Sequence, residues 1–364
     1  MDQRDPSLAR LIDQVSHARA QRLALEIRGG GTKAFYGGAG VGEPLHVAGV
    51  AGISSYEPTE LVVTARAGTP LADLESALEE GGQCLPFEPP RFSPGGTVGG
   101  MVAAGLAGPS RAYVGSVRDH LLGVTLLNGR GEVLTFGGQV AKNVAGYDLS
   151  RLMAGSLGIL GVICEVSLKV LPIDSATSTL VFDWDEARSL ERLKAWASQP
   201  LSINASAWHA GRLRVRLSGA AAAVNTACVK LGGAAMEPAD AAAWWSSVRD
   251  QTQKFFALED ADMARGVGLW RLSVPATTAA LQLPGEQFIE WHGAERWWRT
   301  AATAAEVRAA AARGGGHATL MRGADKSSGT FAALSEGLMR LHQRLKQAFD
   351  PECVFNRGRM YAEL

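Results

Sequence analysis

The chain has 364 residues, of which 46% are hydrophobic and 20% charged, and this composition is typical of a globular protein. Because a single hydrophobic core rarely serves more than about 300 residues, we expect two domains. The 36 basic and 36 acidic residues cancel and form no long run of like charge. This balance argues against nucleic acid or an anionic membrane as the main partner.

The N-terminal residues and the cysteines indicate the compartment. Residues 1–21 lack the basic start and apolar core of a secretory signal, and no uninterrupted apolar stretch is long enough to span a membrane. We therefore expect a cytoplasmic protein. The cysteines at 84, 164, 228 and 353 form no C-x-x-C pair, so the sequence predicts neither a disulfide framework nor a cysteine-bound metal cluster.

The first 172 residues alternate between helical and strand patterns. Apolar residues at helical spacing within 8–26 predict a helix, and the segment LALEIRG that follows predicts a strand that enters a glycine turn. The same criteria predict a strand at 61–68, a helix at 71–80 that stops at two glycines, a hairpin at 120–138 and a strand at 163–172. This first part is mixed α and β.

The composition changes after Pro172, because all nine tryptophans lie beyond it. The order of patterns from 178 to 231 is strand, helix, two strands and helix, and a weaker copy follows from 267 to 323, with a short helix expected at 276–282. Both copies resemble a split β-α-β arrangement with helices on one face of an antiparallel sheet. A last helix is expected at about 330–348.

Two glycine stretches predict a binding groove for a phosphate-containing ligand. In RGGGTK, 28–33, three consecutive glycines after a strand allow backbone N–H groups to converge on an anion, although a plain tight turn is the alternative. In SPGGTVGGMVAAGLAGPSR, 93–111, backbone amides and small side chains suit a pyrophosphate and a flat ring, although a glycine-rich packing helix would explain them too.

Other motifs are weaker. The glycines of GGAGVGEPL, 37–45, are spaced like a dinucleotide fingerprint, but Pro44 makes the required helix improbable. Residues 108–115, GPSRAYVG, continue the second stretch with a hydroxyl and an arginine. Residues 141–168 add Gly155, Gly158 and Gly161 around a serine.

Together these segments and the terminal FDPECVFNRGRM resemble the flavoprotein family typified by vanillyl-alcohol oxidase and p-cresol methylhydroxylase. Within that family they are most similar to the FAD-binding subunits of bacterial glycolate oxidases. The resemblance covers residues 20–172 and the last dozen residues. It implies an α+β fold with a two-lobed FAD-binding domain over 1–172, an antiparallel α+β cap domain over 173–345, and a tail, 346–364, that returns to the flavin domain.

The resemblance also implies the cofactor and its contacts. Two loops would hold the pyrophosphate, the segment after them would continue along the cofactor, two glycines and a valine would line the adenine end, and an asparagine would lie near the flavin ring. The implied FAD-binding residues are Gly29, Gly30, Gly31, Thr32, Lys33, Pro94, Gly95, Gly96, Thr97, Val98, Gly99, Gly100, Gly108, Ser110, Arg111, Gly115, Gly158, Gly161, Val162 and Asn356.

The sequence departs from the family pattern at two sites. Many relatives carry a histidine that tethers the flavin where Thr32 stands here, so non-covalent FAD is expected. Catalytic relatives carry a glutamate where Leu157 stands, and a histidine-rich metal site in the second domain. No H-x-H or H-x-x-x-H pair is present, although His209, His292 and His317 fall on predicted strands and could converge. The sequence predicts no metal and identifies no catalytic residue.

Two side-chain patterns in the second part allow two interpretations each. Arg212, Arg214 and Arg216 alternate along one strand and so share a face, which could clamp a carboxylate or face solvent. The pairs Trp244–Trp245 and Trp297–Trp298 could mark a partner surface or lie in the core of the cap domain.

The resemblance implies a subunit of a complex that oxidises glycolate to glyoxylate. Its expected partners are a larger catalytic flavin subunit, an iron-sulfur subunit and a small 2-hydroxy acid, with the complex cytoplasmic or peripheral at the inner membrane. Two alternatives remain open at this point. The chain could be a non-catalytic assembly subunit, or a free-standing oxidase of another alcohol or hydroxy acid.

Overall fold

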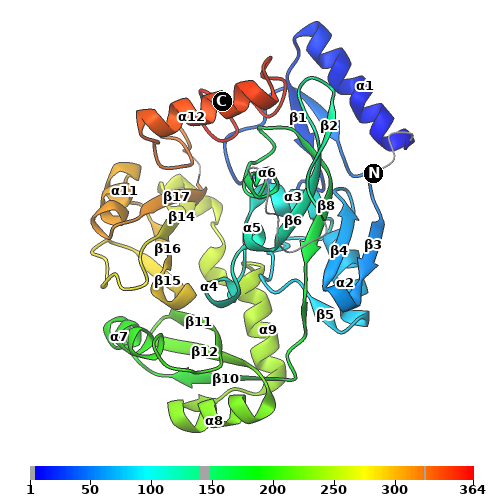
Figure 1. The fold of residues 1–364 in the computed structure, drawn as a ribbon. Coiled ribbons are helices and arrows are strands. Elements are labelled where there is room, and N and C mark those ends of the chain that lie inside the picture. The colour runs from blue at the N-terminus through cyan, green and yellow to red at the C-terminus, as the bar shows by residue number, and fades with distance from the viewer. Residues whose placement is uncertain (1–4, 139–147, 324) are drawn as a thin grey trace. The chain divides into compact units, whose positions relative to one another are not determined.

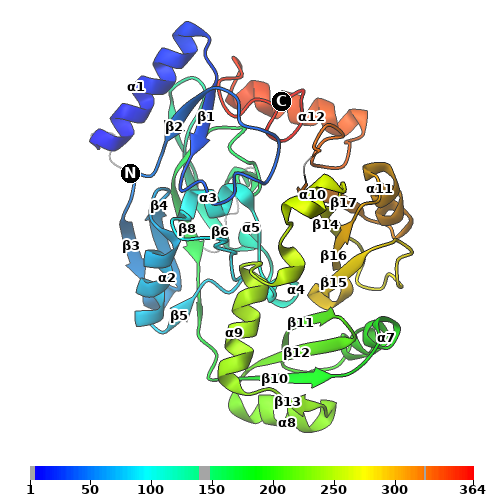
Figure 2. The same ribbon diagram turned by 180° about the vertical axis from the view of Figure 1, so that it is seen from behind.

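The structure is a computed structural model that describes residues 5–138, 148–323 and 325–364 (Figures 1 and 2). The chain divides into two compact units, and each is described by itself. The first unit comprises Met1–Leu106, Ser116–Ile173 and Ala333–Leu364, and the second comprises Ala107–Gly115 and Asp174–Ala332. The sequence motifs near 141–147 lie outside the described residues.

The first unit begins with a capped helix packed on a small sheet. In α1 (Pro6–Gln21) the Asp5 side chain accepts the N–H of Ser7 at 2.8 Å, and the helix ends at Arg22 in the left-handed conformation. Its apolar face packs with β1 (Leu25–Arg28) and β2 (Glu43–His46), which pair in parallel. A strand and no helix follows the glycines at 37–42, so the segment 37–45 lacks the helix that a dinucleotide fingerprint requires, as Pro44 predicts.

A five-stranded antiparallel sheet forms the rest of this unit. Its order is β3 (Ile53–Glu57), β4 (Val62–Arg66), β8 (Val162–Lys169), β6 (Leu121–Leu127) and β7 (Val133–Gly137). The same unit contains the helices α2 (Leu71–Glu80) and α3 (Val98–Ala104), and α3 contacts β4 and β8 of the sheet. The smaller elements are η1 (Pro58–Glu60), β5 (Gln83–Cys84), β9 (Leu171–Pro172), α5 (Val117–His120) and α6 (Leu149–Leu152).

The C-terminal helix α12 (Glu336–Phe349) belongs to the first unit, so the expected boundary at 345 falls too late in the chain. The reason is a buried ion pair at its end. Lys346 Nζ lies 2.8 Å from Asp350 Oδ2 and donates to the carbonyl groups of Ile159 and Phe355 at 2.7 and 2.8 Å. Helical periodicity alone cannot show which unit such a helix packs on.

The second unit is built on an eight-stranded antiparallel sheet with the strand order β13-β10-β12-β11-β15-β16-β14-β17. Its first four strands are β10 (Ala176–Phe182), β11 (Ile203–His209), β12 (Arg212–Gly219) and β13 (Ala234–Ala235), with α7 (Glu186–Trp196) and α8 (Ala221–Leu231). The other four are β14 (Gly268–Ser273), β15 (Glu286–Glu290), β16 (Glu295–Thr300) and β17 (His317–Arg322), with α11 (Ala304–Arg313). The two sets repeat the same topology and meet where β11 pairs with β15.

The repeat differs from the sequence expectation in one element, because the predicted helix at 276–282 is absent from the structure. Pro275 and Pro284 confine this segment. Its Thr278 is held by neighbours, since the hydroxyl donates to the Gly314 carbonyl and the Thr278 carbonyl accepts from Arg296 Nη2 at 2.7 Å. These tertiary contacts replace the first hydrogen bonds that a helix would need.

The face of β12 that carries its arginines is covered by α9 (Pro238–Arg249), a helix that the sequence patterns did not predict. The guanidinium groups of Arg214 and Arg216 lie over the rings of Trp244 and Trp245, at 4.5 and 5.0 Å from the ring centroids. The three arginines thus share a face as expected, but two of them stack on tryptophans and do not simply face solvent. Trp245, Trp297 and Trp298 are buried.

The segment Ala107–Gly115, which contains α4 (Arg111–Val114), groups with the second unit, although the expected first domain ran without a break to 172. It contacts β11 and the short turn η3 (Trp291–Gly293). The remaining elements of the second unit are η2 (Lys254–Phe256) and α10 (Asp260–Ala264).

Candidate functional site

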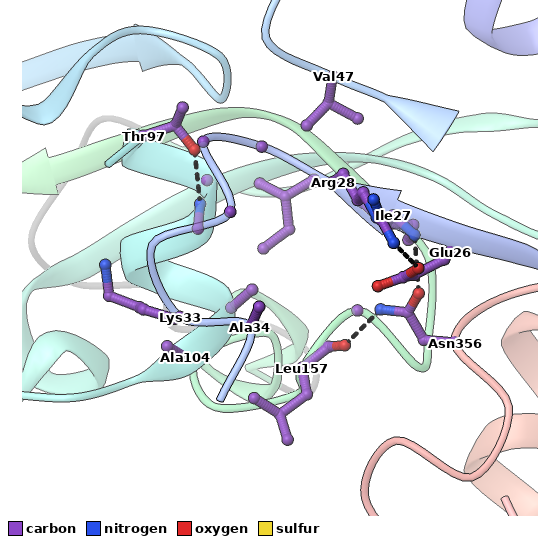
Figure 3. Close-up of a pocket in the computed structure, with 18 of the residues that line it drawn as sticks. Glu26, Ile27, Arg28, Lys33, Ala34, Val47, Thr97, Ala104, Leu157 and Asn356 are labelled. Atoms are coloured by element: carbon purple, nitrogen blue, oxygen red, sulfur yellow. Dashed lines mark hydrogen bonds and ion pairs between the residues drawn. The ribbon is translucent and has the colours of Figure 1, made fainter. Parts of the chain in front are cut away.

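A pocket of about 380 Å³ opens in the first unit between the two glycine stretches (Figure 3). Its volume lies in the range of small-molecule sites. Backbone and small side chains form much of the wall, with charged groups at the rim. The lining residues are Glu26, Ile27, Arg28, Gly29, Gly30, Gly31, Thr32, Lys33, Ala34, Tyr36, Val47, Thr97, Gly99, Gly100, Ala103, Ala104, Leu157, Gly158, Gly161, Ile163, Asn356 and Arg359.

The two glycine loops touch each other, and side chains would separate them. A Cβ atom at Gly30 would lie 1.6 Å from the carbonyl oxygen of Gly95. A Cβ atom at Gly29 would lie 2.5 Å from Oγ1 of Thr97. The glycines at these positions therefore permit a contact between the end of β1 and the start of α3 that no other residue allows.

The second stretch forms a helix start. Thr97 has extended backbone angles and its hydroxyl accepts the N–H of Gly100 at 3.2 Å, so it is the N-cap of α3. Gly99 faces the residue that follows β4, since a Cβ there would lie 2.6 Å from the Cβ of Ala67. Both interpretations of this stretch therefore hold, because α3 packs tightly on the sheet through one glycine and lines the pocket as well.

The first stretch has the geometry of an anion nest. Gly31 is left-handed at φ 71°, and within the described ranges no hydrogen bond uses the N–H groups of Gly30, Gly31 or Thr32. The ammonium group of Lys33 lies 3.9 Å from where a Cβ at Gly96 would be. Backbone N–H groups beside a cation attract a negative group, so this part of the pocket suits phosphate oxygens.

Asn356 closes the pocket from the C-terminal segment (Figure 3). Its amide donates to the Leu157 carbonyl at 2.7 Å, and its Oδ1 accepts the N–H of Ile27 at 2.8 Å. Gly158 is left-handed, and a Cβ there would lie 2.7 Å from this amide. The Asn356 side chain thus joins β1 to the 157–158 turn, a positioning role that the sequence did not indicate.

Charged side chains form the rim of the pocket. Arg28 Nη2 lies 2.6 Å from Glu26 Oε2, and Arg359 donates to the carbonyl groups of Gly38 and Ala34 at 2.6 and 3.1 Å. Burial lowers the pKa of the Arg359 guanidinium, and Glu26 opposes this shift. Arg359 therefore fastens the C-terminal segment to the loop that follows the nest.

The pocket brings together part of the residue set implied by the resemblance. Eleven of them line it: Gly29, Gly30, Gly31, Thr32, Lys33, Thr97, Gly99, Gly100, Gly158, Gly161 and Asn356. Pro94, Gly95 and Gly96 lie in the adjoining loop, and Val98 and Val162 are fully buried. Gly108, Ser110, Arg111 and Gly115 belong to the second unit. The sequence motifs do not include the lining residues Glu26, Arg28, Tyr36 and Arg359. Their closeness in sequence to the motifs is the one feature that could have indicated them.

The three histidines of the second unit have separate partners. His209 stacks on Phe288 with ring centroids 5.1 Å apart, whereas the backbone N–H of His292 donates to Ser206 Oγ at 3.0 Å. His317 begins β17 and pairs with Ser273. Among the described residues no group of three or more His, Cys, Asp or Glu side chains could hold a metal ion, so the idea that these histidines converge is wrong.

Comparison with known proteins agrees with this geometry. The FAD binding domain family matches residues 7–137. The glycolate oxidase subunit GlcE of Escherichia coli strain K12 is 46% identical over 97% of this chain and 97% of its own length. The glycolate oxidase subunit GlcD of Bacillus subtilis strain 168 is 32% identical over 35% of this chain, which is 27% of that protein. A D-lactate dehydrogenase of Anaerostipes hadrus is 34% identical over 36% of this chain and 28% of that protein.

Solved structures show the same fold. An alkyldihydroxyacetonephosphate synthase structure matches with a TM-score of 0.64 at 13% identity and covers 95% of this chain and 73% of the synthase chain. The fold is thus that of a two-lobed FAD-binding domain with an antiparallel α+β cap domain. In the part of the chain that the structure describes, no helix combines the length and hydropathy needed to cross a membrane.

Proposed function

Because the chain belongs to the glycolate oxidase subunit GlcE family, we propose that it is the FAD-binding subunit of a complex that oxidises glycolate to glyoxylate. The reaction removes a hydride from the carbon that bears the hydroxyl and a proton from that hydroxyl. FAD, when bound, supplies the two-electron acceptor for such a reaction. An iron-sulfur partner would then receive the electrons.

The observation that carries the proposal is the contact between the two glycine loops. It places unused backbone N–H groups and the Lys33 ammonium in a pocket that is also lined by small and apolar side chains such as Ala103, Ala104 and Ile163. A dinucleotide has this distribution of properties, with an anionic centre between two flat ring systems. The pocket therefore fits FAD, and Thr32 at the tethering position favours non-covalent binding.

We propose that the nest at 29–33 and the loop at 94–100 hold the pyrophosphate, whereas Gly158 and Gly161 lie against the cofactor. Asn356 would hold the pocket walls in place and would not bind the cofactor through its amide, since the amide already joins two backbone segments. Gly108, Ser110, Arg111 and Gly115 remain assigned to FAD by the resemblance alone. Val98 and Val162 would contribute backbone only, because their side chains are buried.

The GlcE relative is named as a subunit of a glycolate oxidase, and this supports a complex of several chains. We propose that its other members are a larger catalytic flavin subunit and an iron-sulfur subunit. A cytoplasmic complex, or one peripheral at the inner membrane, would suit a chain with this composition.

The test of the cofactor site uses two substitutions of one residue. A Cβ at Gly96 has space, with Thr32 Oγ1 at 3.5 Å as its nearest neighbour, so Gly96→Ala should fold and keep FAD. Gly96→Asp places a carboxylate beside Lys33 and should abolish FAD binding, because it neutralises the cation and repels the phosphates. Flavin absorbance of the purified proteins is the measurement. Equal flavin occupancy in the two variants would show that the phosphates bind elsewhere.

The role in the complex is tested by anaerobic mixing with glycolate. If the flavin of the isolated chain bleaches, the chain is an independent oxidase. If it bleaches only with the partner subunits present, it transfers electrons within the complex. Flavin that stays oxidised during turnover of the complex would identify an assembly subunit.

A further inference from the structure

The pocket of the first unit has a carboxylate at the end away from Lys33. Glu26 belongs to β1 and lines the pocket, and Figure 3 shows Glu26 and Lys33 on opposite sides of the cavity. The Glu26 side chain is only 16% exposed. A carboxylate repels phosphate oxygens, so Glu26 does not serve the anionic centre of a dinucleotide. It faces a different part of the ligand.

Neighbouring groups hold the Glu26 carboxylate in place. Arg28 Nη2 donates to Glu26 Oε2 at 2.6 Å. The backbone at Gly40 passes over the carboxylate, since a Cβ atom there would lie 2.1 Å from the Glu26 carboxyl carbon. Within the described ranges no hydrogen bond reaches the other oxygen, Oε1. The protein thus fixes one oxygen and leaves the other as an acceptor for a ligand.

The walls beside Glu26 suit a flat ring. Figure 3 shows Asn356 next to Glu26, and a Cβ atom at Gly158 would lie 2.7 Å from the Asn356 amide and 3.2 Å from Cδ1 of Ile27. Ile27 and Ile163 line the same pocket. A small apolar wall beside a hydrogen-bond acceptor matches a nucleoside, because its base is flat and its ribose hydroxyl groups donate hydrogen bonds.

We propose that Glu26 recognises the adenosine half of the dinucleotide and accepts hydrogen bonds from its ribose hydroxyl groups. That the ligand is a flavin dinucleotide rests on the proposed function. The flavin half also carries hydrogen-bond donors, but its ring gains negative charge when it accepts a hydride, and a nearby carboxylate opposes that gain. The adenosine half accepts no electrons, so it is the half that suits the acidic end of the pocket.

The same carboxylate makes the site selective for an unmodified ribose. A phosphate group on the 2′-hydroxyl would bring further negative charge to Glu26, and this excludes such a ligand. Arg28 does not offset that charge, because its guanidinium is already paired with Glu26. Removal of the carboxylate would release Arg28, whose side chain is 51% exposed, to bind a phosphate group.

The test is a calorimetric titration of the full-length chain, freed of FAD, with ADP and with 2′,3′-dideoxy-ADP. Both ligands carry the pyrophosphate and adenine, and only ADP has the ribose hydroxyl groups. The unchanged chain should prefer ADP about tenfold or more, the typical effect of a hydrogen bond to a charged group. Glu26→Met should abolish this preference. Because the preference is a ratio within one protein, a general loss of folding does not imitate the result.

The matched control is Glu352→Met. Glu352 also pairs with an arginine, at 2.8 Å from Arg19 Nε, but it lies outside the pocket lining of the same unit. This variant should keep the preference of the unchanged chain for ADP.

A second titration compares adenosine 2′,5′-bisphosphate with 5′-AMP. The unchanged chain should bind the bisphosphate more weakly than AMP, because Glu26 repels the 2′-phosphate. Glu26→Met should reverse this order, since it releases Arg28 for the 2′-phosphate. The same order in both proteins would contradict the proposed selectivity.

Other ligands identify other contacts of Glu26. IDP lacks the amino group of adenine, and FMN lacks the whole adenosine half. If Glu26→Met abolishes a preference for ADP over IDP, or weakens FMN binding and leaves ADP binding unchanged, Glu26 contacts the base or the flavin half and the proposal is wrong.

Two further results would overturn the proposal: no binding of ADP by the unchanged chain, or an undiminished preference for ADP over dideoxy-ADP in Glu26→Met. A chain that holds FAD without this Glu26-dependent preference would leave the proposed function standing. A chain that binds ADP through Glu26 but does not hold FAD would support the adenosine site and contradict the proposed function.

Discussion

The glycine-lined pocket of the first unit and the 290–295 turn of the second unit are built in opposite ways. The pocket walls of the first unit consist largely of backbone and small side chains, and their shape depends on the lack of a side chain at glycine. The turn of the second unit is crowded with ionisable and aromatic side chains, two of them in a strained backbone conformation. Added atoms should damage the pocket, whereas the removal of an ionisable group from the turn should change how stability depends on pH.

The largest expected effect on stability comes from the first unit and is an exception to this comparison, because it results from the removal of a charged side chain, Lys346. Lys346→Met leaves Asp350 buried without its cation, and this should lower the free energy of unfolding by about 3–5 kcal/mol. The same change should loosen Asn356, which follows the anchored segment. Denaturant unfolding and flavin retention measure the two effects.

The control for this prediction lies on the same helix. Arg340 and Glu336 have the same spacing, i and i+4, but their side chains are 66% and 91% exposed. Arg340→Met should therefore change the free energy of unfolding by less than about 1 kcal/mol. Similar losses in the two variants would mean that burial does not strengthen the Lys346–Asp350 pair.

The second prediction sharpens the comparison through pH. Burial raises the pKa of the Glu295 carboxyl to about 7 in the folded chain, whereas an unfolded chain releases this proton near 4.5. The folded state therefore binds more protons in this window, and its stability falls as the pH rises through it, by about 3 kcal/mol in total.

Glu295→Gln should remove this slope and make the chain more stable than the original at pH 8. Urea unfolding at pH 5 and pH 8 measures it, and a parallel slope in the variant would show that Glu295 is ionised throughout. No comparable slope is expected from Gly30 or Gly31, which carry no ionisable group.

The last prediction, Gly30→Ala, combines the smallest expected loss of stability with a loss of FAD binding. Gly30→Ala forces the two glycine loops apart, because its Cβ would overlap the Gly95 carbonyl. The cost should be about 1–3 kcal/mol, typical of overpacking, since both loops can shift. FAD binding should nevertheless be lost. Gly138→Ala is the matched control, since a Cβ there meets nothing within 4 Å, and retained FAD in Gly30→Ala would show that the loops can part without harm.

The sequence predicted the pocket better than the turn because glycines at fixed positions are visible in a sequence, whereas the burial of charged residues is not. Backbone recognition requires glycine at particular positions, so RGGGTK and PGGTVGG were legible, and the structure brings them together. In EWHGAERWWRT charged residues and tryptophans are mixed without a regular period, so the segment does not show which side chains are buried. Only the tertiary structure shows that Glu290, Glu295 and Arg296 are buried.

The helices and strands show the same contrast between local patterns and tertiary contacts. Strands and helices with strong local patterns, such as α2 and the β6–β7 hairpin, formed where expected. The segment 276–282 did not become a helix, because contacts of Thr278 with Gly314 and Arg296 outweigh its local preference. Helix α9 was not predicted, although Pro238 at its first position and its apolar positions Ala241, Trp245 and Val248 were available signals.

The strand order of the second unit has a consequence for its origin. Numbered within each half, the order is 4-1-3-2 followed by 2-3-1-4, so equivalent strands, β11 and β15, meet at the centre. Only three residue pairs join them: Ala207 with Glu290, Trp208 with Ile289 and His209 with Phe288. Two separate copies of a four-stranded module would associate in this way as a symmetric dimer. Fusion of such copies into one chain allows each half to diverge, so that one copy of the central hairpin could acquire Glu290 and Glu295 while its counterpart did not.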